Sequence, residues 1–335
     1  MKAIIPVAGA GTKLRPHTYT QPKALLPVAG KPIIAHLLDQ LIESGFSEFV
    51  IVLGYLGEKI RDYIAHQYPS LKVSYVSQQN PDGIGHAVWL CKDFVKKNEE
   101  LLIVLGDSLI DTEISALAGT SGNVLGVKKV DDPRGFGVAN VEDQTNCTGR
   151  IVSLEEKPEI PVSNLALVGI YRIADSRKLF TELDELIKRN HRTHGEIQLT
   201  DALMNMISSG TIMTAFKVNS WFDCGKKEVL LETNATMLRK RKPASDQLPF
   251  YDNTIIVDPV FIAPTCRISN SIIGPNVSIG DNTVVSSSII RDSIVGANAQ
   301  LKEVLLHHSV IGSDSAISGT NHSLNIGDNT EIDLG

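Results

Sequence analysis

The sequence predicts an α/β domain with a mixed, mainly parallel sheet, followed by a C-terminal parallel β-helix. Two observations support this prediction. In the first half of the chain, short β-branched runs alternate with helical patterns, which is typical of parallel strands joined by crossover helices. Beyond Asn253, aliphatic residues recur at six-residue steps with small turn residues between them, which is typical of stacked β-helix coils.

The N-terminal domain is predicted from its apolar pattern. After an apolar run at residues 3–7, Pro32 opens a helix whose apolar positions form one stripe that ends at Gly45. A strand is expected at 49–53, and a second cycle of helix, strand, helix and strand at 59–68, 73–76, 87–95 and 101–105. After about Asp107 the pattern becomes mixed, with strands expected at 124–127, 138–141, 151–154 and 167–173 and helices at 177–188, 199–207 and up to about 241. Ligands of open α/β sheets bind at the C-terminal ends of the parallel strands.

The repeat domain is predicted from copies of one hexad. Ile273-Gly-Pro-Asn-Val-Ser and Ile279-Gly-Asp-Asn-Thr-Val are adjacent copies, and similar strings begin at Val295, Ile311 and Ile326. Three hexads per turn leave room for about four to five coils. A β-sandwich with coincidental spacing is the alternative. The predicted division is a first domain at 1–240, a linker at 241–252 and the β-helix at 253–335.

Composition limits the class of protein and its partners. The chain has 335 residues, 42% of them hydrophobic and 21% charged, which is ordinary for a globular protein. A net charge of -6 argues against a nucleic-acid partner, for which a basic face is expected. No apolar segment is long enough to span a membrane. Four scattered cysteines without a CxxC pair favour the cytoplasm.

A glycine-rich turn follows the first apolar run, in the string Gly9-Ala10-Gly11-Thr12-Lys13-Leu14-Arg15-Pro16. Backbone N–H groups of such a turn can approach a phosphate, and the cations Lys13, Arg15 and Lys23 lie close by in the sequence. The string is not a P-loop, and Leu14 stands where the dinucleotide fingerprint has its third glycine. The pattern therefore predicts a nucleotide-phosphate site.

The whole string from Gly9 to Pro32 closely resembles the N-terminal signature of sugar-1-phosphate nucleotidylyltransferases. Further motifs extend the resemblance over about residues 1–240, and residues 253–335 resemble hexapeptide-repeat proteins. The resemblance implies a Rossmann-like catalytic domain and a left-handed β-helix. It also implies transfer of a nucleotidyl group from an NTP, with dTTP or UTP favoured, to a sugar 1-phosphate, with glucose 1-phosphate favoured. One departure is Lys13, which stands where the family usually has an arginine and lacks its bidentate fork.

The resemblance assigns residues to the nucleotide. It implies that Lys13 steadies the triphosphate and that Lys23 holds phosphate near the reacting centre. The string Tyr75 to Ala87 resembles the segment that reads the base, with Gln78 at the base edge. The amide of Gln78 matches the N3–H and carbonyls of uracil or thymine, and a flipped amide could serve other bases. The predicted nucleotide-binding residues are Ala8, Gly9, Gly11, Thr12, Lys13, Gln78 and Gly83.

Two carboxylates in turns are candidates for a metal site. Asp107 ends the string Leu105-Gly106-Asp107, and Asp223 lies in Trp221-Phe222-Asp223-Cys224-Gly225. The family has metal-binding aspartates at these positions, which implies Mg²⁺, a cation that prefers oxygen ligands and keeps several waters. From the residues alone, each aspartate could equally be a turn former or helix cap. The predicted catalytic residues are Lys13, Lys23, Asp107 and Asp223.

The string Ser153-Leu154-Glu155-Glu156-Lys157-Pro158 matches the sugar-pocket motif of the family. The match implies that Glu156 accepts hydrogen bonds from sugar hydroxyls and that Lys157 grips the sugar phosphate. Gly137 and Gly169 fall where the family brings its backbone close to the sugar. An exposed strand end and glycines required for packing are the alternative interpretations.

Two other functions stay open. His307-His308 lies in the repeat segment, where acyltransferases of this repeat class use a histidine as base, so a bifunctional enzyme with an acyltransferase β-helix is one alternative. The short β-helix argues against it. The second alternative is a non-catalytic regulatory or scaffolding homologue, which the lysine at position 13 leaves open. We expect a homo-oligomer in either case, because β-helix ends and faces are often shared between copies.

Overall fold

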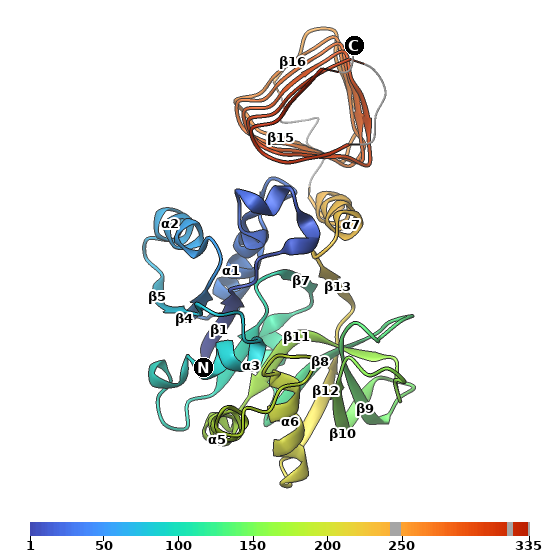
Figure 1. Ribbon diagram of the computed structural model, residues 1–335. Coiled ribbons are helices and arrows are strands. Elements are labelled where there is room, and N and C mark those ends of the chain that lie inside the picture. Colours follow the sequence, from blue (N-terminus) through green and yellow to red (C-terminus); the bar gives the residue numbers. More distant parts are fainter. Residues whose placement is uncertain (242–248, 320–323, 334–335) are drawn as a thin grey trace. The chain divides into compact units, whose positions relative to one another are not determined.

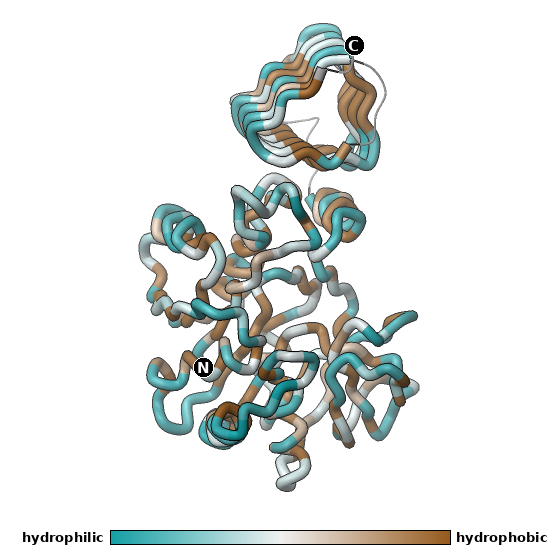
Figure 2. The backbone as a smooth tube through the Cα atoms, viewed as in Figure 1, coloured by the Kyte–Doolittle hydropathy of each residue, from teal (hydrophilic) through white to brown (hydrophobic). Residues whose placement is uncertain are grey.

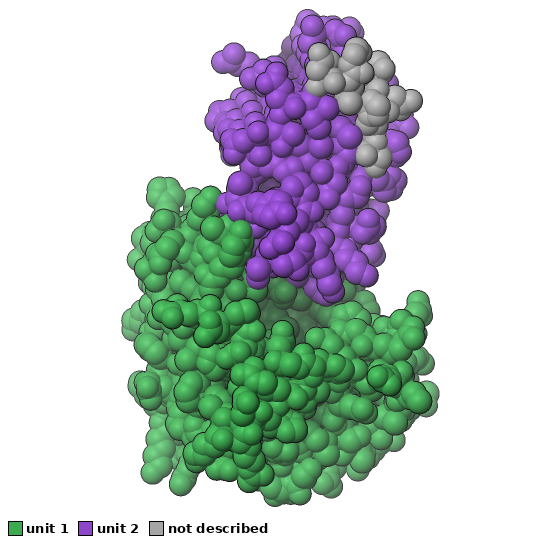
Figure 3. All heavy atoms as spheres, viewed as in Figure 1, with its two compact units in different colours: residues 1–9, 37–221 green, residues 10–36, 222–335 purple. Residues whose placement is uncertain are grey.

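The computed structural model of the protein describes residues 1–241, 249–319 and 324–333. Contacts divide the chain into two compact units, which Figure 3 colours separately. Unit 1 contains residues 1–9 and 37–221, and unit 2 contains residues 10–36 and 222–335. Most of the predicted linker at 241–252 lies outside the described residues.

Unit 1 is built on a nine-stranded mixed sheet with the order β5-β4-β1-β6-β11-β8-β12-β10-β9 (Figure 1). The first four strands in this order are parallel, while β11 is antiparallel to both of its neighbours. The strands are β1 (Lys2–Val7), β4 (Glu48–Leu53), β5 (Lys72–Ser77), β6 (Leu101–Val104), β8 (Asn123–Lys129), β9 (Gly137–Asp143), β10 (Thr148–Glu156), β11 (Leu165–Ile173) and β12 (Met213–Lys217). The strand predictions thus hold to within a few residues, but β12 was missing from them.

Helices α3, α5 and α6 cover one face of this sheet and share its apolar core. Helix α5 illustrates why: Leu179, Leu183 and Leu186 recur on one side and are buried, and the Asp175 carboxylate caps its start by accepting from the Lys178 N–H. The helices of the chain are α1 (Ile33–Glu43), α2 (Gly57–Gln67), α3 (Ile84–Trp89), α4 (Ile114–Ala118), α5 (Ser176–Lys188), α6 (Leu199–Ser208) and α7 (Lys227–Arg239).

Two helix predictions need correction. The helix expected at 87–95 begins earlier, at Ile84, and ends at Trp89, after which a separate 3₁₀ turn, η4, covers Lys92–Phe94. The apolar stripe predicted for α1 is buried at Ile33 through Leu41, but Ile42 is exposed. Among the described residues, no helix is long and apolar enough to cross a membrane.

Short elements follow the glycine-rich turn in unit 2. Three 3₁₀ turns and a small hairpin replace any long helix between β1 and α1. They are η1 (Thr12–Leu14), η2 (His17–Tyr19), η3 (Lys23–Leu25), β2 (Pro27–Val28) and β3 (Lys31–Pro32). Two further short strands are β7 (Ser108–Asp111) and β13 (Ser220–Asp223).

The repeat segment forms a parallel β-helix with three sheets of four, five and five strands. Aliphatic residues of the strands are buried inside the β-helix and stack in register, as in Ile262, Ile279, Val295 and Ile311. Figure 2 shows the result as brown bands that run from coil to coil. The strands are β14 (Ile255–Ile256), β15 (Val260–Ile262), β16 (Arg267–Ser269), β17 (Ile272–Ile273), β18 (Val277–Ile279), β19 (Val284–Ser286), β20 (Ile289–Arg291), β21 (Ile294–Val295), β22 (Gln300–Lys302), β23 (Leu305–His307), β24 (Val310–Ile311), β25 (Ala316–Ser318), β26 (Asn325–Ile326) and β27 (Glu331–Asp333).

The turn residues of the hexads explain the corners of the β-helix. Asn282, Asn298 and Asp314 all have positive φ, a conformation that asparagine and aspartate tolerate better than most residues. Their side chains form a ladder, since Asn282 donates to Asn298 and Asn298 donates to Asp314. Hydrogen bonds between neighbouring coils join residues 17 or 16 positions apart, so a coil is shorter than three full hexads.

Candidate active site

In unit 1, Asp107 follows the buried end of β6. The Gly106 N–H donates to the Pro6 carbonyl at 3.1 Å, and the Leu105 N–H donates to the Gly169 carbonyl at 2.9 Å. Gly169 has a φ of +81°, and a Cβ there would lie 2.8 Å from the Leu105 side chain. Gly169 therefore contributes at least a packing role, because it lets β11 and the strand end that carries Asp107 approach each other.

The side chain of Gln78 is buried and fixed in orientation. Its amide nitrogen lies 3.0 Å from the Gly83 carbonyl and 3.0 Å from Nδ1 of His86. Burial lowers the pKa of His86, which favours the neutral imidazole that can accept at Nδ1. Both amide hydrogens of Gln78 are thereby used, and the group that it can present to a ligand is its Oε1 acceptor.

The loop that carries Gln78 rests on the segment before α6. Gly83 has a φ of +98°, and a Cβ there would lie 2.5 Å from the Ile197 carbonyl oxygen. The Gly85 N–H donates to that oxygen at 2.9 Å, and the Ile197 N–H donates to the Asp82 carbonyl at 2.8 Å. Close contact between two backbones is why this position needs a glycine.

Glu156 lies at the end of β10, opposite Gly137 on β9. The Thr200 hydroxyl, at the start of α6, donates to Oε2 of Glu156 at 2.6 Å. A Cβ on Gly137 would lie 3.0 Å from the same oxygen and 3.1 Å from the Thr200 hydroxyl. The structure therefore brings two predicted sugar-site residues, Glu156 and Gly137, into one cluster with Thr200.

Lys157 extends this cluster. Its ammonium lies 3.7 Å from Oε1 of Glu156, and its side chain is 42% exposed against 10% for Glu156. The Lys157 N–H donates to the Phe136 carbonyl at 3.0 Å, which fixes the backbone after β10. A cavity of about 370 Å³ adjoins Glu156 and Lys157 and is lined also by His194 and Asp201. Gly137 and Gly169 do not line this cavity.

In unit 2, the glycine-rich turn is compact. Gly11 has a φ of +60°, and the Thr18 hydroxyl donates to its carbonyl at 2.9 Å. A Cβ on Gly11 would lie 3.0 Å from the Thr18 side chain and 3.1 Å from Cβ of Lys23. Thr12 and Lys13 form the exposed start of η1 directly after Gly11. The turn thus presents the Lys13 cation while Lys23 packs beneath it.

The two predicted catalytic residues Lys23 and Asp223 meet in unit 2. The Lys23 ammonium lies 3.1 Å from Oδ1 of Asp223, with side-chain exposures of 9% and 44%. The Gly225 N–H donates to the Asp223 carbonyl at 2.6 Å, so Asp223 ends β13 at a tight turn. An exposed carboxylate beside a buried ammonium suits a phosphate site with a bound cation.

No cluster of three or more His, Cys, Asp or Glu side chains suited to a metal ion occurs among the described residues. The predicted donor set is smaller, with one carboxylate each from Asp107 and Asp223. Two carboxylates fit Mg²⁺, which usually binds through one or two carboxylates and completes its shell with substrate phosphates and waters. Asp107 lies in unit 1 and Asp223 in unit 2, so it is the carboxylate chemistry of each residue taken singly that fits this ion.

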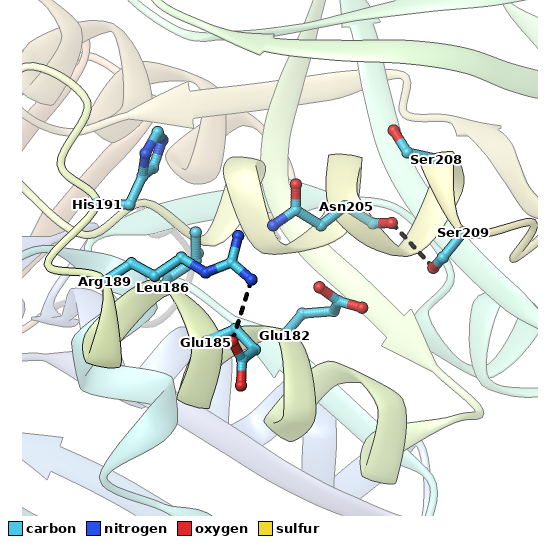
Figure 4. Close-up of a pocket in the computed structure, with 8 residues that line it drawn as sticks. All are labelled: Glu182, Glu185, Leu186, Arg189, His191, Asn205, Ser208 and Ser209. Carbon is cyan, nitrogen blue, oxygen red and sulfur yellow. Dashed lines mark hydrogen bonds and ion pairs between the residues drawn. The ribbon is translucent and has the colours of Figure 1, made fainter.

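A larger cavity of about 490 Å³ lies between α5 and α6 (Figure 4). Its polar side chains largely bond within their own helices: Arg189 pairs with Glu185 at 3.3 Å, and the Ser209 hydroxyl donates to the Asn205 carbonyl at 3.0 Å. None of the predicted site residues lines it.

Sequence reasoning missed Thr200 and His86 as supports of the site. Thr200 is 44 positions from Glu156, and only the packing of α6 against β10 brings the two together. His86 lies in the string Tyr75 to Ala87, but the sequence of that string does not indicate its hydrogen bond to Gln78. The predicted His307-His308 pair lies at the end of β23 and the following turn, with both side chains exposed.

The family model described as Nucleotidyl transferase matches residues 2–240. The chain belongs to this family. It is therefore a nucleotidyltransferase, which confirms the enzyme class predicted from the sequence. The resemblance and the fold class are confirmed as well, and the parallel C-terminal sheets are consistent with a left-handed β-helix.

Several curated relatives match all or nearly all of the chain. The low-salt glycan biosynthesis nucleotidyltransferase Agl11 of Haloferax volcanii is 30% identical, with 100% of both chains covered. A glucose-1-phosphate thymidylyltransferase of Streptomyces griseus is 31% identical over 93% of this chain and 92% of the relative. The bifunctional protein GlmU of Methanococcus vannielii is 32% identical over 94% of this chain and 78% of the relative.

Solved structures match about 72% of the chain. UDP-glucose pyrophosphorylase complexed with UDP-glucose is 26% identical and has a TM-score of 0.63 over 72% of this chain and 99% of that chain. A putative glucose-1-phosphate thymidylyltransferase from Bacillus anthracis is 30% identical and has a TM-score of 0.61 over 72% of this chain and 97% of that chain.

Proposed function

We propose that this nucleotidyltransferase transfers a nucleotidyl group from dTTP or UTP to a sugar 1-phosphate, with glucose 1-phosphate as the favoured acceptor. A phosphate oxygen of the sugar attacks the α-phosphate of the NTP in line, and pyrophosphate leaves. The names of the relatives, which include thymidylyltransferase and UDP-glucose pyrophosphorylase, support this substrate class. Because two polyanions must meet, the protein has to supply cations and positioning more than covalent chemistry.

The observation that carries the proposal is the cluster of Glu156, Thr200 and Lys157. The Thr200 hydroxyl holds one oxygen of Glu156 at 2.6 Å, which orients the carboxylate and leaves acceptor capacity for the hydroxyls of a sugar. The Lys157 ammonium lies 3.7 Å from the other oxygen of Glu156, so a sugar bound to this carboxylate would have a cation nearby for its phosphate. A carboxylate that accepts from hydroxyls, next to a cation that binds phosphate, matches the two parts of a sugar 1-phosphate.

Gln78 supports the choice of base. With its amide nitrogen occupied by Gly83 and His86, it offers an acceptor to the ligand. Thymine and uracil carry an N3–H donor, whereas the N3 of cytosine is itself an acceptor and would face Oε1 without a hydrogen. We therefore expect dTTP and UTP to be better substrates than CTP. GTP also carries a donor, its N1–H, so the test includes it as a purine nucleotide.

In the proposed mechanism, Lys13 and the backbone of the glycine-rich turn bind the triphosphate. Lys23 stabilises the charge that develops on the transferred phosphate, and Lys157 holds the phosphate of the attacking sugar. Asp107 and Asp223 would hold Mg²⁺, which neutralises phosphate charge when bound. The non-catalytic alternative is disfavoured because Lys23, Asp107, Asp223 and Lys157 are all retained.

The remaining features of the proposal concern organisation. We propose a catalytic domain at 1–240, a linker at 241–252, a β-helix domain at 253–335, and assembly into a homo-oligomer. The family match at residues 2–240 supports the first boundary. The cysteines are buried and none of the four forms a disulfide, which fits a reducing cytoplasm.

The test is a matrix of dTTP, UTP, CTP, GTP and ATP against several sugar 1-phosphates, with Mg²⁺ and with pyrophosphate release as the readout. We expect release with dTTP or UTP and glucose 1-phosphate to exceed release with CTP. Release with none of the combinations would refute the proposal. Consumption of acetyl-CoA in the presence of an amino sugar phosphate would instead support the bifunctional alternative.

A further inference from the structure

The glycine-rich turn belongs to the same compact unit as the β-helix. Residues 10–36, which we call the signature segment, and residues 222–335 together form unit 2 (Figure 3). The signature segment carries Lys13 and Lys23. Its contacts within unit 2 therefore decide how these two cations are presented.

The first set of contacts joins the signature segment to the last coil of the β-helix. Nε2 of His17 lies 2.5 Å from Oδ1 of Asn325, and the Thr20 hydroxyl donates to the Asp328 carboxylate. Pro16 packs against Gly327 of the same coil, since a Cβ on Gly327 would lie 3.0 Å from Cβ of Pro16. His17 is 3% exposed, so this contact is closed to solvent rather than a loose surface touch.

The second set of contacts is centred on Asn234 of α7, which is fully buried. Its Oδ1 accepts from the Ala29 N–H at 2.9 Å and from the Ser278 hydroxyl at 2.7 Å. Its Nδ2 donates to the Asn276 carbonyl at 3.1 Å. One side chain thus ties the hairpin of the signature segment to β18 of the β-helix, with its polar atoms satisfied.

A close apolar contact adds to this second set. A Cβ on Gly30 would lie 2.6 Å from the ring of Phe261, a residue of β15. The Arg241 guanidinium lies 5.0 Å from the centre of the same ring and donates to the Ala29 carbonyl at 2.6 Å. Gly30, with a φ of +87°, is therefore the residue that lets the hairpin and the β-helix approach.

In the sequence, the two contact sets lie on either side of Lys23, and the first set begins shortly after Lys13. Lys13 lies four positions before His17, and Lys23 lies between Thr20 and Ala29. We propose that the β-helix acts as a positioning element for catalysis, holding the signature segment at two places so that Lys13 and Lys23 are in position before substrate binds. Asn325 and Asp328 are then positioning residues of the last coil. This inference rests on the proposed function, because it assigns Lys13 and Lys23 to the substrate phosphates.

The physical reason is preorganisation. Before α1 begins, the signature segment consists of short 3₁₀ turns and a hairpin whose two strands have two residues each. Its own backbone hydrogen bonds therefore fix little of its conformation. Catalysis by charge stabilisation requires cations that do not have to reorganise during the reaction. A rigid stack of coils on one side of the segment supplies that order without contributing any group to the substrate.

The test compares Thr20→Val, which removes the hydroxyl that binds Asp328, with Thr20→Ser, which retains it. Asn325→Ala removes the acceptor of His17. The control is Thr265→Val, which removes a Thr–Asp hydrogen bond of 2.9 Å to Asp281 elsewhere in the β-helix, together with the bond of 2.8 Å that the Asn282 N–H donates to the same hydroxyl. The full-length variants are compared by amide hydrogen exchange of peptides from residues 11–26 without substrate, and by kcat and KM for both substrates.

We expect both Thr20→Val and Asn325→Ala to exchange faster in residues 11–26. Thr20→Val should lose about tenfold in kcat, the order that a lost hydrogen bond to a charged group supports, and Asn325→Ala, which loses a bond between neutral groups, should lose about two- to tenfold. Thr20→Ser and Thr265→Val should resemble the wild-type protein in both measurements. Equal loss of kcat in Thr265→Val would overturn the proposal, because it would reduce the effect to general stability. Unchanged exchange in both test variants, or faster exchange with unchanged kcat, would overturn it too.

Failure of the proposed function has a different outcome. If the wild-type protein releases no pyrophosphate from any substrate pair, the assigned activity is wrong. The exchange measurement needs no substrate, so it would still report whether the last coil orders residues 11–26.

Discussion

The substitution Thr200→Val tests the sugar site directly. Thr200 is 5% exposed, and its hydroxyl donates to Oε2 of Glu156 at 2.6 Å. Valine keeps the shape but places a methyl group against the carboxylate. A hydrogen bond to a charged acceptor contributes about 1.5–3 kcal/mol. Since about 1.4 kcal/mol corresponds to a factor of ten, loss of this hydrogen bond corresponds to a weakening of sugar binding of about 10- to 150-fold.

Steady-state pyrophosphate release measures this effect when each substrate is varied in turn. We expect KM for the sugar 1-phosphate to rise at least about tenfold, while KM for the NTP stays the same, because Glu156 is assigned to the acceptor alone. Thr200→Ser should restore the sugar KM. Thr181→Val is the control, because the Thr181 hydroxyl donates to the Arg177 carbonyl of its own helix at 2.9 Å. A sugar KM that does not respond to Thr200→Val would refute the role of Glu156.

Four further predictions follow from the site and its supports. Asp107→Asn should abolish Mg²⁺-dependent pyrophosphate release while leaving Tm unchanged; full turnover would exclude Asp107 as a metal ligand. Lys13→Arg should lower KM for the NTP several-fold, since the guanidinium can bind phosphate through two hydrogen bonds; an unchanged KM would place Lys13 away from the triphosphate. Gly83→Ala should lower Tm and weaken NTP binding, because its Cβ would lie 2.5 Å from the Ile197 oxygen at a φ of +98°, a strain of about 1–3 kcal/mol; titration calorimetry and thermal melting measure both. Burial lowers the pKa of His17 below its usual value of 6.5, so just below that pH the unfolded chain binds more protons than the folded protein. The free energy of unfolding should therefore fall on acidification through this window, and it should fall less in His17→Gln. Thermal melting of the wild-type protein and His17→Gln between about pH 5 and 7.5 measures this, and identical curves at every pH would contradict it.

The sequence was most informative where structure depends on local pattern. The stripe of α1 and the hexads of the β-helix were predictable because each requires one residue type at a fixed period. Even the asparagines of the hexads have a local cause, since they occupy corners with positive φ. By contrast, the length of one coil depends on how the three faces close, and six-residue spacing alone overestimated it.

The supports of the site could not be predicted in this way. Thr200 reaches Glu156, and Asn234 reaches Ala29 and Ser278, across sequence separations of 44, 205 and 44 residues. No periodicity connects such positions; only tertiary packing does. Family resemblance named Glu156, Lys157 and Gln78, but not the side chains that fix their orientation. The roles of the named residues stay predictions until the substitutions above are measured.

The contact between Lys23 and Asp223 decides which aspartate is the better probe of the metal. The Lys23 side chain is 9% exposed, and the Asp223 carboxylate lies 3.1 Å from its ammonium. Removing the charge of Asp223 would leave a largely buried cation with less compensation, which destabilises a protein independently of any metal. Loss of activity in Asp223→Asn would thus combine two causes, a displaced Lys23 and a lost metal ligand. If the metal is the main cause, Asp223→Asn should lose activity at a Tm close to that of Asp107→Asn; if the ion pair is, its Tm should fall well below.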